Sequence, residues 1–175
     1  MTATIEFTTP EAIEEMTLSI LKKHDLLGTV STAVNPVAVA NGEGIEVFSV
    51  DLADDSVCGI LRKEQGRFRL YVNRDHSGNR IRYTIAHELG HFFLHGHVLD
   101  AFVDQEINLF RNKTDPASKL HADMEIQANM FAAALLMPAV SVRRWYQHES
   151  DISILAKRFG VSREAMGQRI DNLGL

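Results

Sequence analysis

The strongest constraint on this chain is the segment HELGH at residues 87–91, which lies within a helical pattern of apolar residues. Residues i and i+4 of a helix point to the same side, so His87 and His91 can direct ring nitrogens at one ion. Tetrahedral Zn²⁺ accepts imidazole nitrogen at about 2.0–2.1 Å. Glu88 lies beside this pair, where it can take a proton from water on the metal. The fold must therefore bring a third ligand to this helix.

Four residues are candidates for that third ligand, since a catalytic zinc needs three protein ligands and one open position. Glu125 lies on a second predicted helix whose small residues would allow close packing. His97 has the spacing of a third metzincin histidine, but Leu94 stands where such a site needs a glycine. His121 and Asp123 could reach the metal if the second helix began earlier. The two-histidine-one-glutamate combination favours Glu125, and the other three remain open.

Length and composition indicate one domain over residues 1–175. The net charge of -5 and the pI near 5.9 argue against binding to nucleic acid or anionic membrane over the whole surface. The one cysteine, Cys58, permits no intrachain disulfide, and we expect it to be buried and inert. The first residues do not resemble a secretory signal, and no apolar run approaches the roughly 20 residues of a membrane span. We therefore expect a cytoplasmic protein with no membrane partner.

The apolar periodicity predicts an α+β fold. A short three- or four-stranded sheet would pack on the HELGH helix and on the second, ligand-bearing helix, with a helical C-terminal third. Thr9 is a predicted N-cap for a first helix that ends before Gly28. The other expected elements are a short helix at 36–40, strands at 45–50, 57–62 and 68–72 with a hairpin turn at 64–67, a helix at 79–95, a short strand at 107–110, a helix at 119–136, and two or three helices in 140–175.

Two separated motifs resemble the ImmA/IrrE family of metallopeptidases. Residues 84–91, TIAHELGH, with His95 one turn later, are similar to the family's histidine helix. Residues 125–138, EIQANMFAAALLMP, are similar to its second helix, although Gln127 stands where the family often has an acidic residue. Residues 155–162, LAKRFGVS, resemble the family's usual ending. Together these motifs cover the chain from about residue 45 to the C-terminus.

The resemblance implies a zincin-like fold with a gluzincin-type site. In such a site His87, His91 and Glu125 hold one zinc ion, and Glu88 is the catalytic base. The implied activity is that of a zinc metallopeptidase that hydrolyses peptide bonds. Members of this family are often associated with helix-turn-helix repressors of mobile elements or stress responses, and some cleave them. The resemblance thus implies a protein or peptide substrate, such as a transcriptional repressor.

Several supporting roles stay open at the level of sequence. Asn129, one turn beyond Glu125 on the same face, could orient a ligand or cap a backbone group. His95 is expected to be a polar residue that favours a helix C-terminus. A peptide substrate would add as a strand along one of the predicted strands or residues 107–110. Candidate donors to the oxyanion are Arg82, Tyr83, His95, His121 and Tyr146, and expected surface histidines are His24, His76 and His148.

The C-terminal region supports a rival hypothesis, a DNA-binding or toxin-like regulator whose zinc site is structural or sensory. Residues 156–170 resemble a helix-turn-helix with Gly160 in the turn and Ser162 as cap. A helix pair that packs on the catalytic core explains the same pattern. Acidic residues dilute the local basic charge, so direct DNA binding through these helices is the minor alternative. Glu88 argues against a structural zinc, which needs no base.

Overall fold

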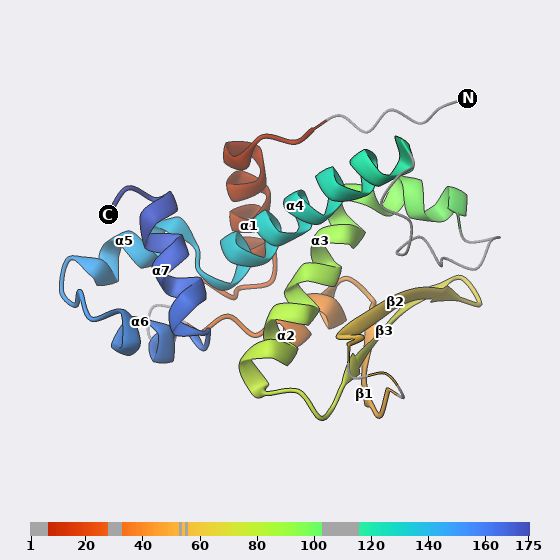
Figure 1. The fold of residues 1–175 in the computed structure, drawn as a ribbon, viewed down its shortest axis with the longest axis horizontal. Helices are drawn as coiled ribbons and strands as arrows, with labels where there is room; N and C mark the ends of the chain where they lie inside the picture. Colours follow the sequence, from red (N-terminus) through yellow and green to blue (C-terminus); the bar gives the residue numbers. More distant parts are fainter. Residues whose placement is uncertain (1–6, 28–32, 53, 55, 103–115) are drawn as a thin grey trace.

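A computed structural model describes residues 7–27, 33–52, 54, 56–102 and 116–175 of the chain (Figure 1). The expected strand at 107–110 lies outside these residues. The other expected elements are confirmed with shifts of up to three residues at their ends, except that the helix expected at 79–95 continues to Phe102. In chain order the elements are α1 (Pro10–Lys23), α2 (Pro36–Gly42), β1 (Glu46–Val50), β2 (Gly59–Glu64), β3 (Arg67–Asn73), α3 (Gly78–Phe102), α4 (Pro116–Leu136), α5 (Ala139–Tyr146), α6 (Ile152–Phe159) and α7 (Arg163–Asn172).

The sheet has three strands in the order β1-β3-β2, so β2 lies at one edge. Strands β2 and β3 form an antiparallel hairpin, and β1 pairs with β3 in parallel. The hairpin turn is Gln65-Gly66, and both residues have positive φ, at 50° and 79°. Two consecutive left-handed residues match the right-handed twist of the flanking strands, which is why such turns connect hairpins. Leu70 and Val72 of β3 are buried toward the helices.

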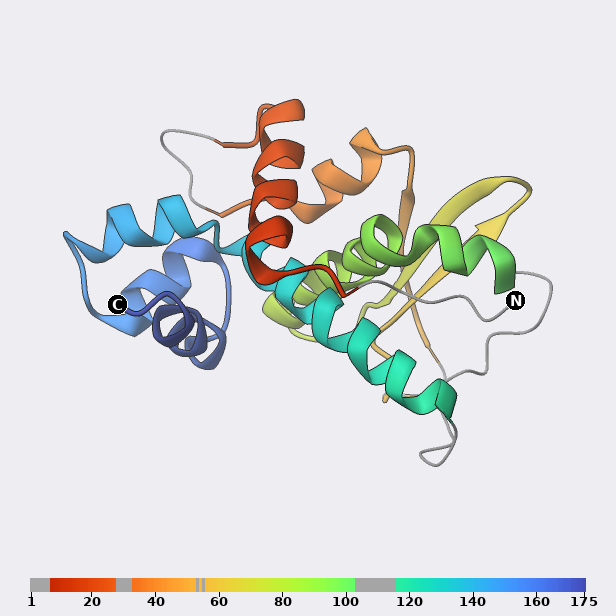
Figure 2. The same cartoon turned by 90° about the horizontal axis from the view of Figure 1, so that it is seen from above.

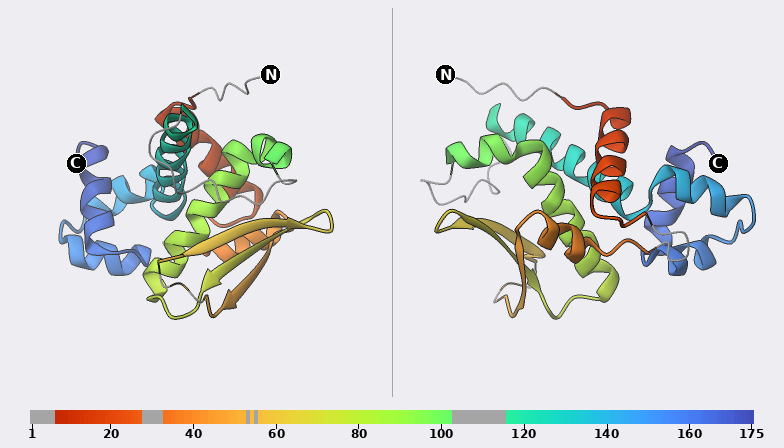
Figure 3. Two further views of the ribbon diagram at one scale, coloured as in Figure 1. Left: turned by 45° about the vertical axis from the view of Figure 1, so that its right-hand side comes forward. Right: turned by 180° about the vertical axis from the view of Figure 1, so that it is seen from behind.

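The helices α2 and α3 pack against the sheet, and α4 packs on α3. Figure 2 shows α3 and α4 crossing in the middle of the molecule, with the sheet on one side and α5–α7 on the other. Figure 3 shows α2 beside α3 near the sheet. The helix α1 covers α4, and its buried residues include Ile13 and Leu21. The central pair α3 and α4 is therefore enclosed by other elements on several sides.

The close approach of α3 and α4 depends on Gly90. A Cβ atom at this position would lie 2.9 Å from the Cα of Ala128 and 3.0 Å from its carbonyl oxygen. One helical turn further on, the rings of Phe93 and Phe131 stack with centroids 5.4 Å apart. The prediction that Gly90 admits a neighbouring element is confirmed, and Ala128 is the small residue of α4 at that contact.

The first turns of α3 are tied to the C-terminal helices through two side chains. Arg82 donates from Nε to the carbonyl oxygen of Gly160 at 3.0 Å, and from Nη2 to those of Val34 at 2.7 Å and Phe159 at 3.3 Å. Asn79 donates to the carbonyl oxygen of Val161 at 3.1 Å. Carbonyl groups at a helix end lack intrahelical partners, and a guanidinium satisfies several of them at once. These bonds orient Arg82 toward the end of α6.

An ion pair between buried Arg169 and partly exposed Glu14 fixes α7 to the N-terminal half of the chain. Arg169 lies 2.6 Å from Glu14 of α1 and donates to the carbonyl oxygen of Met137 at 2.9 Å. Ser162 caps α7 by accepting from the backbone N–H of Ala165, as expected. Among the described residues, no single helix is long and apolar enough to cross a membrane. The helices Leu120–Leu136 and Ala139–Tyr146 reach that length and apolar composition only when counted together, and they are bent by 52° at the break between them.

The expectation that His24 is a surface residue is wrong. Its side chain is largely buried at the end of α1, and its Nε2 atom lies 2.6 Å from Glu43 Oε1. Its ring fills the space beside Gly42, where a Cβ atom would lie 2.4 Å from the ring. The spacing along the chain could not show this contact, because the partner comes from α2, beyond a loop.

We expect Gly90→Ala to separate α3 from α4, because the added methyl group meets backbone atoms that cannot rotate away. Overpacking of this kind costs about 1–3 kcal/mol in the free energy of unfolding, which urea denaturation measures. Gly96→Ala on the same helix is the matched control, since a Cβ atom there has no neighbour within 4 Å. Equal stability of the two variants would contradict the proposed close contact.

Candidate metal centre

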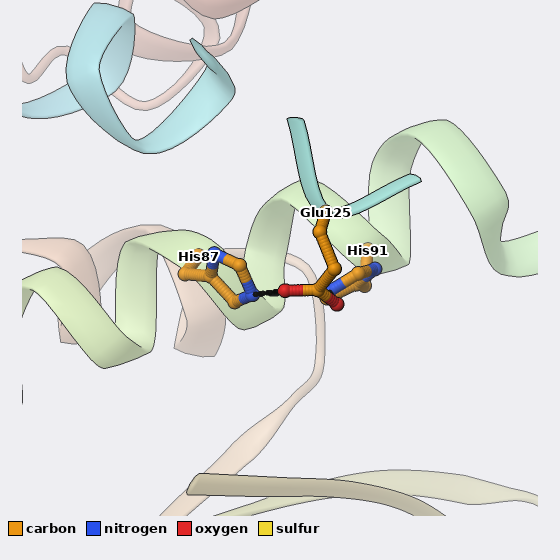
Figure 4. Close-up of side chains that lie close together, drawn as sticks. All are labelled: His87, His91 and Glu125. Atoms are coloured by element: carbon orange, nitrogen blue, oxygen red, sulfur yellow. Dashed lines mark hydrogen bonds and ion pairs between the residues drawn. The ribbon is translucent and has the colours of Figure 1, made fainter. Parts of the chain in front are cut away.

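Three side chains from two helices converge on one point. His87 and His91 extend from α3, and Glu125 reaches toward them from α4 (Figure 4). The two Nε2 atoms lie 3.1 Å apart. The Glu125 carboxylate places Oε2 3.3 Å from His87 Nε2 and Oε1 3.0 Å from His91 Nε2. The structure thus brings together the three residues expected as ligands, on the two helices that Gly90 allows to meet.

These distances fit a tetrahedral metal ion. Ligand atoms bound at about 2.0–2.1 Å in tetrahedral geometry lie about 3.3 Å from one another. The nitrogen–nitrogen distance of 3.1 Å and the nitrogen–oxygen distances of 3.3 and 3.0 Å are close to that value, with one carboxylate oxygen of Glu125 nearest to each histidine. Two nitrogens and one carboxylate oxygen are also the donor set of many catalytic zinc sites. The residues present therefore fit a metal ion, and the metal itself is not identified by this geometry.

The electrostatics of the site favour an ionised Glu125. Burial raises the pKa of this carboxyl, but hydrogen bonds and charges from His87 and His91 outweigh that effect and hold it well below its usual value. For His87, burial lowers the pKa, while Glu125, Glu88 and Asn129 raise it above the usual value. The net pKa shifts of Glu125 and His87 show that the carboxylate and the charged imidazole stabilise each other. A bound metal cation would take the place of the imidazole charge as the partner of the carboxylate.

His87 is oriented by Asn129, one turn beyond Glu125 on α4. The Nδ1 atom of His87 donates to Asn129 Oδ1 at 3.0 Å, and the hydroxyl of Tyr83 donates to the same oxygen at 2.7 Å. In neutral His87, donation from Nδ1 leaves the lone pair on Nε2, which faces the site. Burial raises the pKa of Tyr83, and the charge of Glu125 adds to this. Of the two sequence interpretations of Asn129, the structure supports the orienting one.

The expectation that His95 is a polar residue at a helix C-terminus is wrong. Its side chain is fully buried, and its Nδ1 atom lies 3.2 Å from His91 Nδ1. The helix α3 continues to Phe102, so this position is inside the helix. The spacing of four residues between His91 and His95 was the available signal, because it places both on one helix face.

Glu88 lies between the ligand pair and strand β2. A Cβ atom at Gly59 would lie 3.5 Å from Glu88 Cγ and 2.5 Å from Thr84 Cγ2, so the absence of a side chain at Gly59 lets β2 approach α3. Burial raises the pKa of Glu88, the charges of His91 and His87 lower it, and Glu125 raises it further. The result is a carboxyl whose pKa lies above its usual value, next to the ligand atoms.

The alternatives for the third ligand have different outcomes. Among the described side chains, the close group of ligand atoms contains neither His121 nor Asp123. His121 lies 3.6 Å from Glu125 Oε1, so it is near the site without joining the group. The side chain of His97 lies outside the described part of the chain, and this alternative is untested by the structure. Of the candidate oxyanion donors, Arg82 is oriented toward the end of α6.

The fold and the site define an α+β domain with a candidate metal centre of the two-histidine-one-glutamate type. The family model of the IrrE N-terminal-like domain, peptidase family M78, matches residues 40–171. The chain belongs to this family, and its resemblance to ImmA/IrrE proteins is confirmed. No match was found among curated proteins.

Among solved structures, the chain is similar to a Mycobacterium tuberculosis transcriptional regulator. The TM-score is 0.66 at 19% sequence identity, over 90% of this chain and 46% of that chain. At this identity the likeness shows the fold. The present chain spans about half the length of that protein.

We expect the purified protein to bind about one zinc ion per chain through the tetrahedral donor set. Zinc at 100 times its Kd should raise the free energy of unfolding by about 2.7 kcal/mol. Glu125→Ala should abolish that gain, and Glu88→Gln should keep it, because Glu88 is not a ligand. Metal analysis and thermal unfolding measure both effects. Loss of metal in His97→Ala, with retention in Glu125→Ala, would show that the third ligand is misassigned.

Proposed function

We propose that the protein is a zinc-dependent endopeptidase with His87, His91 and Glu125 as ligands and Glu88 as catalytic base. The observation that carries this proposal is the convergence of His87, His91 and Glu125 on one point, with the partly buried carboxyl of Glu88 beside the two histidines. Membership of a peptidase family supports the same conclusion. A purely structural metal site has no need of a further carboxyl next to the ligands.

The chemistry proposed for the site divides between the metal and the chain. When bound, zinc lowers the pKa of a coordinated water molecule and polarises a carbonyl group. Glu88 accepts a proton from the attacking water and returns it to the leaving amine. Glu88 lies against β2 at Gly59, next to the two histidines in sequence and space, where its carboxylate can reach a water molecule at the candidate site. Asn129 and Tyr83 keep His87 in the tautomer whose Nε2 faces the site.

The edge strand β2 is the proposed binding site for the substrate backbone. It lies against α3 at Gly59, next to Glu88, and the sheet lies across the site from the helix of Glu125 (Figure 4). The N–H of Asn73 in β3 donates to the carbonyl oxygen of Cys58. Because hydrogen-bonded pairs alternate along an antiparallel ladder, the backbone groups of Gly59, Leu61 and Lys63 point away from β3. These groups can hold an extended peptide.

We further propose that the substrate is a regulatory protein, such as a helix-turn-helix repressor, and that cleavage takes place in the cytoplasm, where repressors act. Two observations support this choice. The family resemblance implies such substrates, and the solved structure of similar fold is named a transcriptional regulator. An extended segment of a partly unfolded or linker region would fit an edge strand better than a folded domain would.

The DNA-binding alternative receives less support from the C-terminal helices. Their turn at Gly160 is held by Arg82, and Arg169 is buried in an ion pair with Glu14. The guanidinium of Arg158 lies 3.7 Å from the ring centroid of Trp145. These contacts describe a helix pair that packs on the rest of the fold. Absence of binding to duplex DNA at low salt would remove the alternative.

Glu88→Gln should lower the cleavage rate of a repressor substrate by roughly 10²–10⁴-fold, because the amide cannot accept a proton. Zinc content and thermal stability should stay unchanged. Mass spectrometry of the cleaved partner measures the rate, and Glu11→Gln, on the exposed start of α1, is the control for a change of carboxyl to amide. Unchanged cleavage by Glu88→Gln would exclude this residue as the base.

For a peptide that is cleaved, methylation of its backbone amides should show an alternating effect. Only alternate amides of a bound strand face β2, so methyl groups at every second position should lower kcat/KM and those between should not. Steady-state kinetics on singly methylated peptides measure this pattern. An effect that does not alternate would contradict binding as an added strand.

A further inference from the structure

We propose that His95 is a positioning residue that holds His91 in place by accepting a hydrogen bond from its Nδ1–H group. This inference rests on the proposed metal site. It assigns a task to a buried histidine that is neither a ligand nor a base. The observations that carry it are the distance of 3.2 Å between the two Nδ1 atoms and the complete burial of His95.

The direction of this hydrogen bond follows from the geometry of His91. Its Nε2 atom faces His87 Nε2 and Glu125 Oε1, so Nε2 must carry the lone pair when a metal is held there. A neutral imidazole with its lone pair on Nε2 has its proton on Nδ1. That proton points at His95 Nδ1, which must then carry a lone pair and accept. His95 is thus assigned the tautomer with its proton on Nε2.

The two ligand histidines are therefore oriented by different elements. His87 donates across the helix interface to Asn129 of α4, whereas His91 donates along its own helix to His95. An acceptor four residues away on the same helix keeps its position even if α4 moves. His91 should hence remain oriented toward the site when Glu125 is displaced, and His87 should not.

Both acceptors also lack the negative charge that a carboxylate would place there. A carboxylate raises the basicity of the imidazole to which it is bonded and so passes electron density toward the metal. The amide oxygen of Asn129 and the ring nitrogen of His95 are uncharged, so they raise the basicity of the ligand histidines less than a carboxylate would. Asn129 and His95 therefore orient the ligands while leaving the metal with more of its charge.

The test compares His95→Asn with His95→Leu, two side chains of similar size and shape. The Oδ1 atom of asparagine is attached to Cγ as Nδ1 is in histidine, so it can accept the same bond, whereas leucine cannot. Zinc affinity, measured by competition with a chelator, should fall about 10–100-fold in His95→Leu. It should stay within a few-fold of the unsubstituted protein in His95→Asn. Stability without metal, measured by urea denaturation, separates this effect from loss of fold.

Equal affinities in the two variants would overturn the proposal, since the acceptor would then have no effect. If neither variant folds, ¹⁵N chemical shifts of the histidine rings in the unsubstituted zinc protein decide. Protonated Nδ1 in His91 with unprotonated Nδ1 in His95 supports the bond, and a protonated Nδ1 in His95 overturns it. Both readouts are independent of turnover, so an inactive protein that binds zinc would defeat the proposed function and leave this inference standing.

Discussion

The contact of α3 with α4 at Gly90 and Ala128 is the constraint on which the rest of the site depends. The two histidines need only one helix, but the third candidate ligand comes from a second helix that must lie at the right distance from the first. A glycine facing a backbone sets that distance with no side chain that could shift. Because the helices touch there, the Glu125 carboxylate lies close to the Nε2 atoms of both histidines. Asn129, one turn later on α4, lies within hydrogen-bonding distance of His87 Nδ1. The close approach of α3 and α4 therefore sets the positions of both Glu125 and Asn129 relative to the histidines.

Several parts of this arrangement could be predicted from the sequence because they follow from local periodicity. The spacing of His87 and His91, the small residues of α4 and the position of Asn129 all depend on 3.6 residues per turn. Choosing Glu125 over His121 or Asp123 also needed chemical knowledge of zinc sites. The hairpin turn was also predictable from local sequence, because Gly66 readily adopts the positive φ that such a turn requires.

Other features could not be obtained in this way, because periodicity shows which residues share a face but not what covers that face. His95 was expected near a helix C-terminus, although α3 extends beyond it and its side chain is fully buried. His24 meets Glu43 only because α1 and α2 end side by side. The proximity of Gly59 to Glu88 depends on strand order, in which β3 lies between β1 and β2. Each of these contacts joins segments whose relation is fixed by packing at long range.

The attachment of Arg82 and Asn79 to the turn between α6 and α7 links the metal site to a distant surface mechanically. Arg82 precedes His87 by five residues, about 7.5 Å along the helix axis. A continuous helix transmits a displacement of its first turns with little loss, since its backbone hydrogen bonds resist bending. The start of the helix that carries both histidines is therefore anchored on the C-terminal helices. Its position relative to Glu125 thus depends in part on contacts made outside the candidate metal centre.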